Sequence, residues 1–368
     1  MKRLLCIVTN MNTGGAETFL MKVYRQLDRK HYQMDFCICN PQKNFYEAEI
    51  EKLGGRIYHL PLKSKHPLRF LYEFCKLLRT QHYTYALRLG STIFEMGDLC
   101  LCGLLGVKAR VFRSCNANAS YAKPFIWAHK LLRGIVMKVA NIKIAPSDLA
   151  AQFTFGNAKD VHLLPNGLDT QAFAFSGEKR QKIRQELNAQ DKFVVGHIGR
   201  FNFQKNHSFL LGIFAEIKKR QSNAVLWLIG KGELEEQIKQ QAKSLGLEES
   251  VVFLGVRADI PALLAAMDAF VFPSLFEGMP NTAIEAQTSG LPCLIADTIT
   301  KQAKQTDIVH FRPLTQSPEK WAQKVLEIAA EQTLDKRAQA AAQMRAAGYD
   351  ISKIGQQFAT LVFGESDA

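Results

Sequence analysis

The chain has 368 residues, enough for two ordinary domains, and its 47% hydrophobic and 22% charged residues are typical of a globular protein. This composition excludes disordered, collagen-like and purely coiled-coil proteins. No apolar run approaches the ~20 residues that a membrane-spanning helix needs. The apolar stretch of residues 4–8 is too short for a signal peptide, so we interpret it as a buried first strand.

The formal net charge of +13 is concentrated in the first half of the chain. Residues 1–169 hold 24 Lys and Arg against 12 Asp and Glu, whereas residues 170–368 hold 23 against 22. A basic half can attract anionic lipid, nucleic acid or an anionic small molecule. No nucleic-acid motif accompanies the charge, so we expect no nucleic-acid partner.

The densest basic patch, residues 63–79, is predicted to be an amphipathic helix. Its expected apolar stripe is flanked by basic residues and consists of Leu68, Leu71, Tyr72, Cys75 and Leu78. Such a helix either lies on a membrane surface or packs on its own sheet with a solvated basic face.

The eight cysteines are too few for a disulfide scaffold. The pairs 37/39 and 100/102 have C-x-C spacing, which matches neither a redox motif nor a zinc finger. We expect buried, reduced thiols and a cytoplasmic protein.

Short apolar runs alternate with helical segments throughout the chain, which predicts an α/β protein with two doubly wound domains. Asn166-Gly167 marks a turn at the join, giving domains of residues 1–168 and 169–349. Residues 350–368 are predicted to form one amphipathic helix opened by Asp350 or Ser352. The expected strands are 4–8, 34–38, 57–60, 86–89, 109–112, 142–145 and 161–164, then 193–198, 224–229, 251–254, 269–272 and 293–296.

The first polar motif, residues 12–17 (NTGGAE), follows the first strand. A Gly-Gly turn that opens a helix there exposes backbone N–H groups to a phosphate or a polar substrate. The spacing is neither the G-x-G-x-x-G of dinucleotide-binding proteins nor a Walker A loop. A plain tight turn is the alternative interpretation.

The second motif, residues 196–207 (GHIGRFNFQKNH), carries two cations directly after a strand that ends at Gly199. Arg200 supplies a planar guanidinium and Lys205 a point charge, and together they could neutralise a diphosphate. Two solvated surface cations are the alternative.

The third motif, residues 273–285 (PSLFEGMPNTAIE), is a loop that leads into a helix. Gly278 permits close backbone approach, and the helix N-terminus favours an anion or sugar oxygens. Glu277 is expected on the loop, where it can bind hydroxyl groups. Glu285 is expected inside the helix, and Thr282-x-x-Glu285 also matches a capping box, which is a structural alternative for that residue.

The ordered set of GGAE (residues 14–17), PNG (165–167), G-R-F-x3-K-N from residue 199 and E-x7-E (277 and 285) resembles the family-4 retaining glycosyltransferases of the GT-B fold, the bacterial surface-polysaccharide type. The resemblance implies two Rossmann-like domains that face each other across a cleft, with the donor on the C-terminal domain and the acceptor on the N-terminal one. It also implies that the helix of residues 350–368 returns to the N-terminal domain.

The resemblance also implies roles for individual residues. Arg200 and Lys205 would hold the donor diphosphate and Glu277 the donor sugar, as the catalytic set, while Glu285 would contact the ribose. The loop after residue 254 would meet the nucleobase. The implied donor-binding residues are Gly14, Gly15, Arg200, Lys205, Val256, Arg257, Glu277, Gly278, Met279, Pro280, Asn281, Thr282 and Glu285, and the acceptor-side candidates are Glu17, Arg113 and Asn116.

One stretch departs from the family pattern. Relatives commonly carry His-Ser-His-Asn where this chain has residues 113–116 (RSCN). This departure indicates either a different donor sugar or an acceptor whose negative charge Arg113 binds. His129, on a predicted helix, is expected to be structural and not to replace the missing histidines.

We therefore expect a retaining hexosyl- or N-acetylhexosaminyltransferase that moves a sugar from a UDP-linked donor to a glycan or a lipid-linked sugar in capsule or lipopolysaccharide synthesis. No Asp-x-Asp pair is present, so we expect neither a metal nor another cofactor. The basic half is consistent with docking on anionic lipid at the inner face of the membrane. A catalytically silent GT-B partner protein and a GT-B sugar-nucleotide epimerase are the alternatives.

Overall fold

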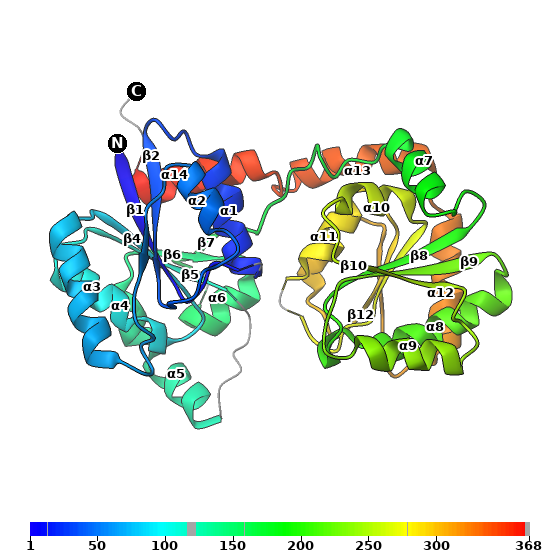
Figure 1. The fold of residues 1–368 in the computed structure, drawn as a ribbon, viewed down its shortest axis with the longest axis horizontal. Coiled ribbons are helices and arrows are strands. Elements are labelled where there is room, and N and C mark those ends of the chain that lie inside the picture. Colours follow the sequence, from blue (N-terminus) through cyan, green and yellow to red (C-terminus); the bar gives the residue numbers. More distant parts are fainter. Residues whose placement is uncertain (13, 116–122, 158, 278, 365–368) are drawn as a thin grey trace. The chain divides into compact units, whose positions relative to one another are not determined.

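The computed structural model describes residues 1–12, 14–115, 123–157, 159–277 and 279–364. The chain divides into two compact units (Figure 1). Unit 1 comprises Met1–Gly167 with Gly348–Ala368, and unit 2 comprises Leu168–Ala347. Each unit holds one parallel sheet with helices on both faces, which confirms the predicted α/β class with two doubly wound domains.

The sheet of unit 1 has the strand order β3-β2-β1-β4-β5-β6-β7, and all of its strand pairs are parallel. Its strands are β1 (Lys2–Val8), β2 (Tyr32–Ile38), β3 (Ile57–His59), β4 (Tyr85–Gly90), β5 (Ala109–Ser114), β6 (Ile142–Ala145) and β7 (His162–Leu163). Its α-helices are α1 (Gly15–Gln26), α2 (Glu47–Lys52), α3 (Pro67–Gln81), α4 (Gly97–Leu104), α5 (Lys123–Val136), α6 (Asp148–Phe155) and α14 (Ile351–Phe363).

Strand β1 shows why this sheet is covered on both faces. Leu4, Cys6 and Val8 belong to one buried cluster, shared with α1 and α14. The alternate residues Leu5 and Ile7 belong to a second cluster, shared with α3, α4 and α6. Successive side chains of a strand point to opposite faces, so a continuous apolar run is what a sheet between two helix layers requires.

Helix α14 is the last helix of the chain, and it packs on unit 1. It begins after Asp350, whose carboxylate accepts a hydrogen bond from the backbone N–H of Ser352 at 3.1 Å. Phe358 is fully buried, and its ring lies edge-on to Phe19 of α1 at 6.2 Å between centroids. The structure therefore confirms that the final helix returns to the N-terminal unit.

The sheet of unit 2 has the order β10-β9-β8-β11-β12-β13, again with parallel pairs. Its strands are β8 (Phe193–Ile198), β9 (Ala224–Ile229), β10 (Val251–Gly255), β11 (Ala269–Phe272), β12 (Cys293–Ala296) and β13 (Val309–Arg312). Its α-helices are α7 (Gly177–Glu186), α8 (His207–Arg220), α9 (Glu235–Ser244), α10 (Ile260–Ala266), α11 (Asn281–Thr288), α12 (Pro318–Ala330) and α13 (Leu334–Ala346).

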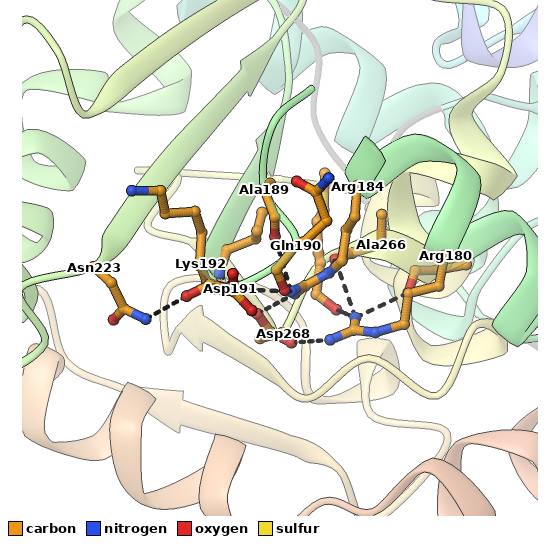
Figure 2. Close-up of polar contacts among 12 residues, drawn as sticks. Arg180, Arg184, Ala189, Gln190, Asp191, Lys192, Asn223, Ala266 and Asp268 are labelled. Carbon is orange, nitrogen blue, oxygen red and sulfur yellow. Dashed lines mark hydrogen bonds and ion pairs between the residues drawn. The ribbon is translucent and has the colours of Figure 1, made fainter. Parts of the chain in front are cut away.

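A cluster of charges ties α7 to the amino ends of β8 and β11 (Figure 2). Arg180 and Arg184 both contact the carboxylate of Asp268, at 2.6 and 2.5 Å. The same carboxylate accepts a hydrogen bond from the backbone N–H of Val194, the second residue of β8, at 2.7 Å. Because this cluster lies at the opposite end of the strands from the polar motifs, we assign it to the stability of unit 2.

Two sequence-based expectations about elements are wrong. The edge strand β13 was not predicted, because only Val309 of its four residues is buried and the apolar run is too short to recognise. Helix α3 begins at Pro67 and buries Phe70, Phe74, Leu77 and Leu78, whereas Leu68 and Tyr72 of the predicted stripe are 81% and 68% exposed. A basic helix thus does pack on its sheet, but largely through a different face.

The cysteine and membrane expectations can be compared with the structure directly. All eight cysteines are free thiols, as expected, and five of them are buried. Cys100 and Cys102 lie on α4. Within the described ranges no helix combines the length and the apolar character needed to cross a membrane.

The contact of α14 with α1 yields a stability prediction. Phe358→Ala removes a fully buried ring and leaves a cavity beside Phe19, so we expect unit 1 to lose about 3–5 kcal/mol of unfolding free energy. Urea denaturation followed by circular dichroism measures the loss. The neighbouring exposed substitution Gln357→Ala is the control, and an equal effect of both would contradict the packing role.

Candidate functional site

The site in unit 2 is built where the strand order of the sheet reverses. Strand β8 pairs with β9 on one side and with β11 on the other. In doubly wound sheets, ligands bind outside the carboxyl ends of the strands at such a switch point. The second and third sequence motifs follow β8 and β11, so both predicted loops begin there.

Hydrogen bonds join these two loops. The backbone N–H of Leu275 donates to the carbonyl of Gln204 at 2.8 Å, and the Gln204 side-chain amide donates to the carbonyl of Phe276 at 2.8 Å. Asn206 adds a bond from its side-chain amide to the carbonyl of Pro273 at 3.2 Å. Asn206 has φ 55°, a left-handed conformation that asparagine tolerates, and it precedes α8.

Lys205 and Glu277 form an ion pair between the two loops. The Lys205 Nζ atom lies 2.5 Å from Glu277 Oε1, and the side chains are only 16% and 11% exposed. The ammonium also lies 4.5 Å from the ring centroid of Phe272. The carbon chain of Lys205 packs against Gly199, where an added Cβ would come within 3.1 Å of it. The structure thus brings two of the three predicted catalytic residues together.

Arg200, the third predicted catalytic residue, lies on the surface of the same loop. Its side chain is 70% exposed and contacts Glu233 at 3.1 Å, which is itself 55% exposed. Exposed pairs of this kind contribute only about 0–1 kcal/mol, so the guanidinium can exchange this carboxylate for a phosphate at little cost.

The loop after β9 contributes residues that the sequence analysis missed. Gly230 and Gly232 pack against the backbone after β8. A Cβ would come within 2.1 Å of the Gly199 carbonyl oxygen at position 230, and within 2.3 Å of the Phe201 carbonyl oxygen at position 232. Only glycine permits this approach, which places Glu233 beside Arg200. The signal in the sequence is the G-x-G of residues 230–232 after an apolar strand.

The start of helix α11 corrects the predicted capping box. The N-cap residue is Pro280, which makes no side-chain cap, and Thr282 is the second residue of the helix. Thr282 therefore does not act as the cap of a box with Glu285, and that structural explanation of Glu285 is wrong. Met279 and Glu285 are half-buried, Pro280 is buried, and Gly278 lies outside the described residues.

Two buried histidines lie beneath Lys205. His197 of β8 shares a hydrogen bond between Nδ1 and the carbonyl of Val271 at 2.9 Å, and its ring lies 4.8 Å from that of His207. His207 stacks on Phe201 at 4.3 Å. Desolvation by burial is the main cause that lowers the pKa of both imidazoles, that of His207 to about 4, so both are neutral at pH 7. The sequence analysis assigned neither of them a role.

The predicted nucleobase loop is partly engaged in ion pairs. Arg257 contacts Asp259 at 2.6 Å and Glu186 at 3.1 Å, and these carboxylates raise the pKa of its guanidinium. Val256 is 74% exposed. The loop therefore presents an apolar side chain next to a fixed cation.

The first motif lies at the switch point of the other sheet, where β1 pairs with β2 and β4. Gly14 is the N-cap of α1 and Gly15 its first residue. A Cβ on Gly14 would come within 2.2 Å of a Glu17 carboxylate oxygen, so the carboxylate folds back over the glycine. Burial raises the pKa of Glu17 above its ordinary value.

The acceptor-side candidate Arg113 is buried inside unit 1. It is 1% exposed, donates from Nη2 to the Asn166 side-chain oxygen at 2.6 Å, and lies 3.6 Å from the ring centroid of Phe19. Burial lowers the pKa of its guanidinium to about 10. These contacts give Arg113 a role in holding Asn166, close to the boundary of the two units, whereas Asn116 lies outside the described residues.

His129 is structural, as expected. It is fully buried, and its Nε2 atom shares a hydrogen bond with the carbonyl of Phe153 at 3.0 Å. Among the described residues, no three or more His, Cys, Asp or Glu side chains gather in a way that could hold a metal ion.

Burial of His207 predicts a pH-dependent stability. Between pH 6.5 and about 4 the unfolded state binds a proton that the folded state does not, so the unfolding free energy falls as the pH drops through this window. At pH 5 the loss from His207 amounts to about 2 kcal/mol. We expect His207→Phe, which keeps the stacking on Phe201, to lose correspondingly less between pH 7 and pH 5. Urea titrations followed by the buried Trp227 and Trp321 of unit 2 measure this difference, and an unchanged pH slope in the variant would contradict it.

Comparison with solved structures defines the class of the fold. A crystal structure of Anabaena Alr3699/HepE in complex with UDP superposes with a TM-score of 0.79 at 21% identity, and the match covers 98% of each chain. Two parallel α/β units of this arrangement are the GT-B fold.

Sequence comparison then gives the family. The profile described as "Glycosyl transferases group 1" matches residues 178–345. The chain is 35% identical over 341 residues to "Putative glycosyltransferase EpsF" of Bacillus subtilis, covering 89% of this chain and 88% of that protein. It is 26% identical over 299 residues to a Campylobacter jejuni enzyme, covering 78% of this chain and 77% of that one. That enzyme is named "GalNAc-alpha-(1->4)-GalNAc-alpha-(1->3)-diNAcBac-PP-undecaprenol alpha-1,4-N-acetyl-D-galactosaminyltransferase". The chain belongs to the group 1 glycosyltransferases.

Proposed function

We propose that this glycosyltransferase moves a hexosyl or N-acetylhexosaminyl group, with retention of configuration, from a UDP-linked sugar to a saccharide carried on a lipid. The observation that carries the proposal is the Lys205–Glu277 pair, held with Arg200 at the switch point of the unit 2 sheet. UDP in the HepE structure supports the choice of nucleotide, and the undecaprenol-linked acceptor in the Campylobacter enzyme's name supports the choice of acceptor.

The departing nucleoside diphosphate needs its growing negative charge stabilised. Lys205 has an ammonium with three donors, of which the Glu277 oxygen occupies one, so it can also bind a phosphate. Arg200 adds a planar fork, and the N-terminus of α11 adds backbone dipoles. Charge-assisted hydrogen bonds of this kind contribute roughly 1.5–3 kcal/mol each. Such stabilisation is commonly the largest single contribution to catalysis of group transfer.

Glu277 has a second task in the proposal. A carboxylate offers about four acceptor positions, so Glu277 can accept hydroxyl groups of the donor sugar while it pairs with Lys205. Glu285, which lies in α11, contacts the ribose in this proposal. The configuration of the sugar is then retained because the acceptor attacks from the front face. In this step the leaving phosphate accepts the proton of the acceptor hydroxyl. No residue of the chain has to act as a general base.

The acceptor is assigned to unit 1, with Glu17 as the candidate partner of an acceptor hydroxyl. Its carboxylate lies at the β1/β4 switch point and is partly desolvated. The backbone N–H of Gly14 donates to the carbonyl of Asn12 at 2.9 Å, which fixes the turn before α1. We propose that Gly14 and Gly15 approach the donor diphosphate at this edge of the sheet.

Substitution of the ion pair tests the proposal. We expect Lys205→Met and Glu277→Gln each to lower kcat for sugar transfer about 100-fold or more, because each removes a group that contacts the reacting diphosphate or sugar. The substrates are UDP-sugars screened first by thermal shift. Arg220→Ala, which breaks an exposed ion pair with Glu319, is the matched control and should retain activity.

The double variant Lys205→Met/Glu277→Gln separates catalysis from folding, since it leaves no unpaired charge. Native-like circular dichroism with lost turnover supports the assignment, whereas wild-type turnover in the single variants refutes it. Tight UDP-sugar binding by the wild type without turnover or donor hydrolysis would favour the silent-partner alternative.

We also propose that the reaction needs no metal ion, since Lys205 and Arg200 supply the positive charge that a bound cation would otherwise provide. Treatment with EDTA followed by gel filtration should therefore leave kcat unchanged within about twofold. Loss of activity that added Mg²⁺ or Mn²⁺ restores would contradict this part of the proposal.

A further inference from the structure

Helix α5 of unit 1 carries an apolar stripe on its outer face. Trp127, Leu131 and Ile135 follow one another at spacings of four residues, so they lie on one side of the helix. Their side chains are 68%, 63% and 73% exposed. Large apolar side chains that gather on one surface, and are not scattered singly, mark a site of interaction.

The opposite face of α5 is fixed to the body of unit 1. His129 is fully buried, and it accepts a hydrogen bond from the backbone N–H of Ile93 at Nδ1 and shares another with Phe153 at Nε2. Arg133 donates to the backbone carbonyls of Gln152 and Phe153 at 2.9 and 2.6 Å. The inward face is therefore anchored by His129 and Arg133, with Val136 packed against the core, and the apolar stripe is exposed on the other side of the helix. Figure 1 shows α5 on the outside of unit 1.

The charged residues of α5 itself all have one sign. Helix α5 contains no acidic residue, Lys123 and Lys130 are exposed on it, and Lys138 follows directly after it. A short helix with an aromatic and aliphatic stripe bordered by lysines is typical of elements that lie in the headgroup region of a bilayer. Tryptophan suits this place because its ring is apolar and its N–H can bond to water or headgroups.

We propose that α5 docks unit 1 on an anionic bilayer surface, with Trp127, Leu131 and Ile135 inserted among the lipids and Lys123 and Lys130 bound to lipid phosphates. The charge distinguishes this partner from a second copy of the chain. A two-fold contact through the same face would bring the lysines of one copy near those of the other, whereas an anionic membrane neutralises them.

This inference rests on the proposed function and deepens it, since it names the membrane that carries a lipid-linked acceptor as the partner of α5. Its test measures membrane binding and requires no transfer of sugar. If the protein binds vesicles through α5 but fails to transfer sugar, the membrane-docking inference stands and the proposed transferase function is overturned.

Helix α3 offers a matched control. Leu68 and Tyr72 are also exposed, at 81% and 68%, among basic residues. The side chain of Arg69 is engaged by Glu73 at 2.7 Å, so the α3 face carries a negative charge that α5 lacks. The two helices thus differ in charge while exposing side chains of similar size.

The experiment is cosedimentation of the full chain with vesicles of phosphatidylcholine and phosphatidylglycerol in equal parts. We expect Trp127→Ser/Leu131→Ser/Ile135→Ser to lower the partition coefficient at least about tenfold, and Leu68→Ser/Tyr72→Ser to change it by less than about twofold. Lys123→Gln/Lys130→Gln should weaken binding several-fold, and raised salt or pure phosphatidylcholine should weaken it in the wild type.

Tryptophan fluorescence gives a residue-specific readout. Trp227 and Trp321 are fully buried in unit 2, so a blue shift on vesicle addition reports mainly on Trp127. The shift should vanish in Trp127→Phe, a variant that keeps an apolar ring and the fold. Thermal denaturation checks that the triple variant is folded, and donor hydrolysis in solution should be unchanged in it.

Three results overturn the proposal: unchanged vesicle binding in the folded triple variant, an equal loss in the α3 variant, or no binding by the wild type. Sedimentation equilibrium tests the alternative partner, a second copy of the chain. A dimer that the α5 substitutions dissociate, together with vesicle binding that they leave unchanged, assigns the stripe to self-association.

Discussion

The contact between Lys205 and Glu277 is the interaction on which the geometry of the unit 2 site depends. The two residues are 72 positions apart in the chain and meet at 2.5 Å because β8 and β11 are parallel neighbours whose carboxyl ends share one edge of the sheet. Bonds between the two loops fix their backbones, and Gly230 allows the next loop to press against them. A partly buried pair is sensitive to the loss of either partner, since the remaining charge would stay desolvated. The contacts that join the two loops therefore also fix the geometry of the site.

Charged residues in this protein divide into two kinds according to what surrounds them. Asp268 is satisfied by Arg180, Arg184 and a backbone N–H, and the buried Asp35 is satisfied by Arg3 and Tyr83. These clusters have their partners within the fold. At the switch point the cations are held differently, since Arg200 pairs with an exposed carboxylate and Lys205 keeps donors for a further acceptor. The difference separates structural charges from those available to a ligand.

Elements that are marked by a local pattern of residues can be predicted from the sequence. Prediction fails where the burial of a residue depends on the tertiary structure. Continuous apolar runs identify the inner strands, because both faces of these sheets are covered. The edge strand β13 and the buried face of α3 were missed or misplaced, since helical spacing alone does not say which of two apolar stripes meets the sheet. In the site, three residues can be recognised from the sequence because they are charged and follow predicted strands: Arg200, Lys205 and Glu277. His197 and His207 do not, because a histidine in an apolar run has no pattern that reveals its neighbours.

The return of α14 to unit 1 has a consequence for the order in which the two units can fold during synthesis. Unit 2 is complete in sequence at Ala347, whereas unit 1 lacks the helix that covers Phe19 until Ile351–Phe363 have been synthesised. Domains fold largely as units while the chain emerges from the ribosome. The second unit can thus reach its native state first, and the first unit becomes complete only when α14 has been added. Docking of α14 is then the step that completes the core of the amino-terminal unit.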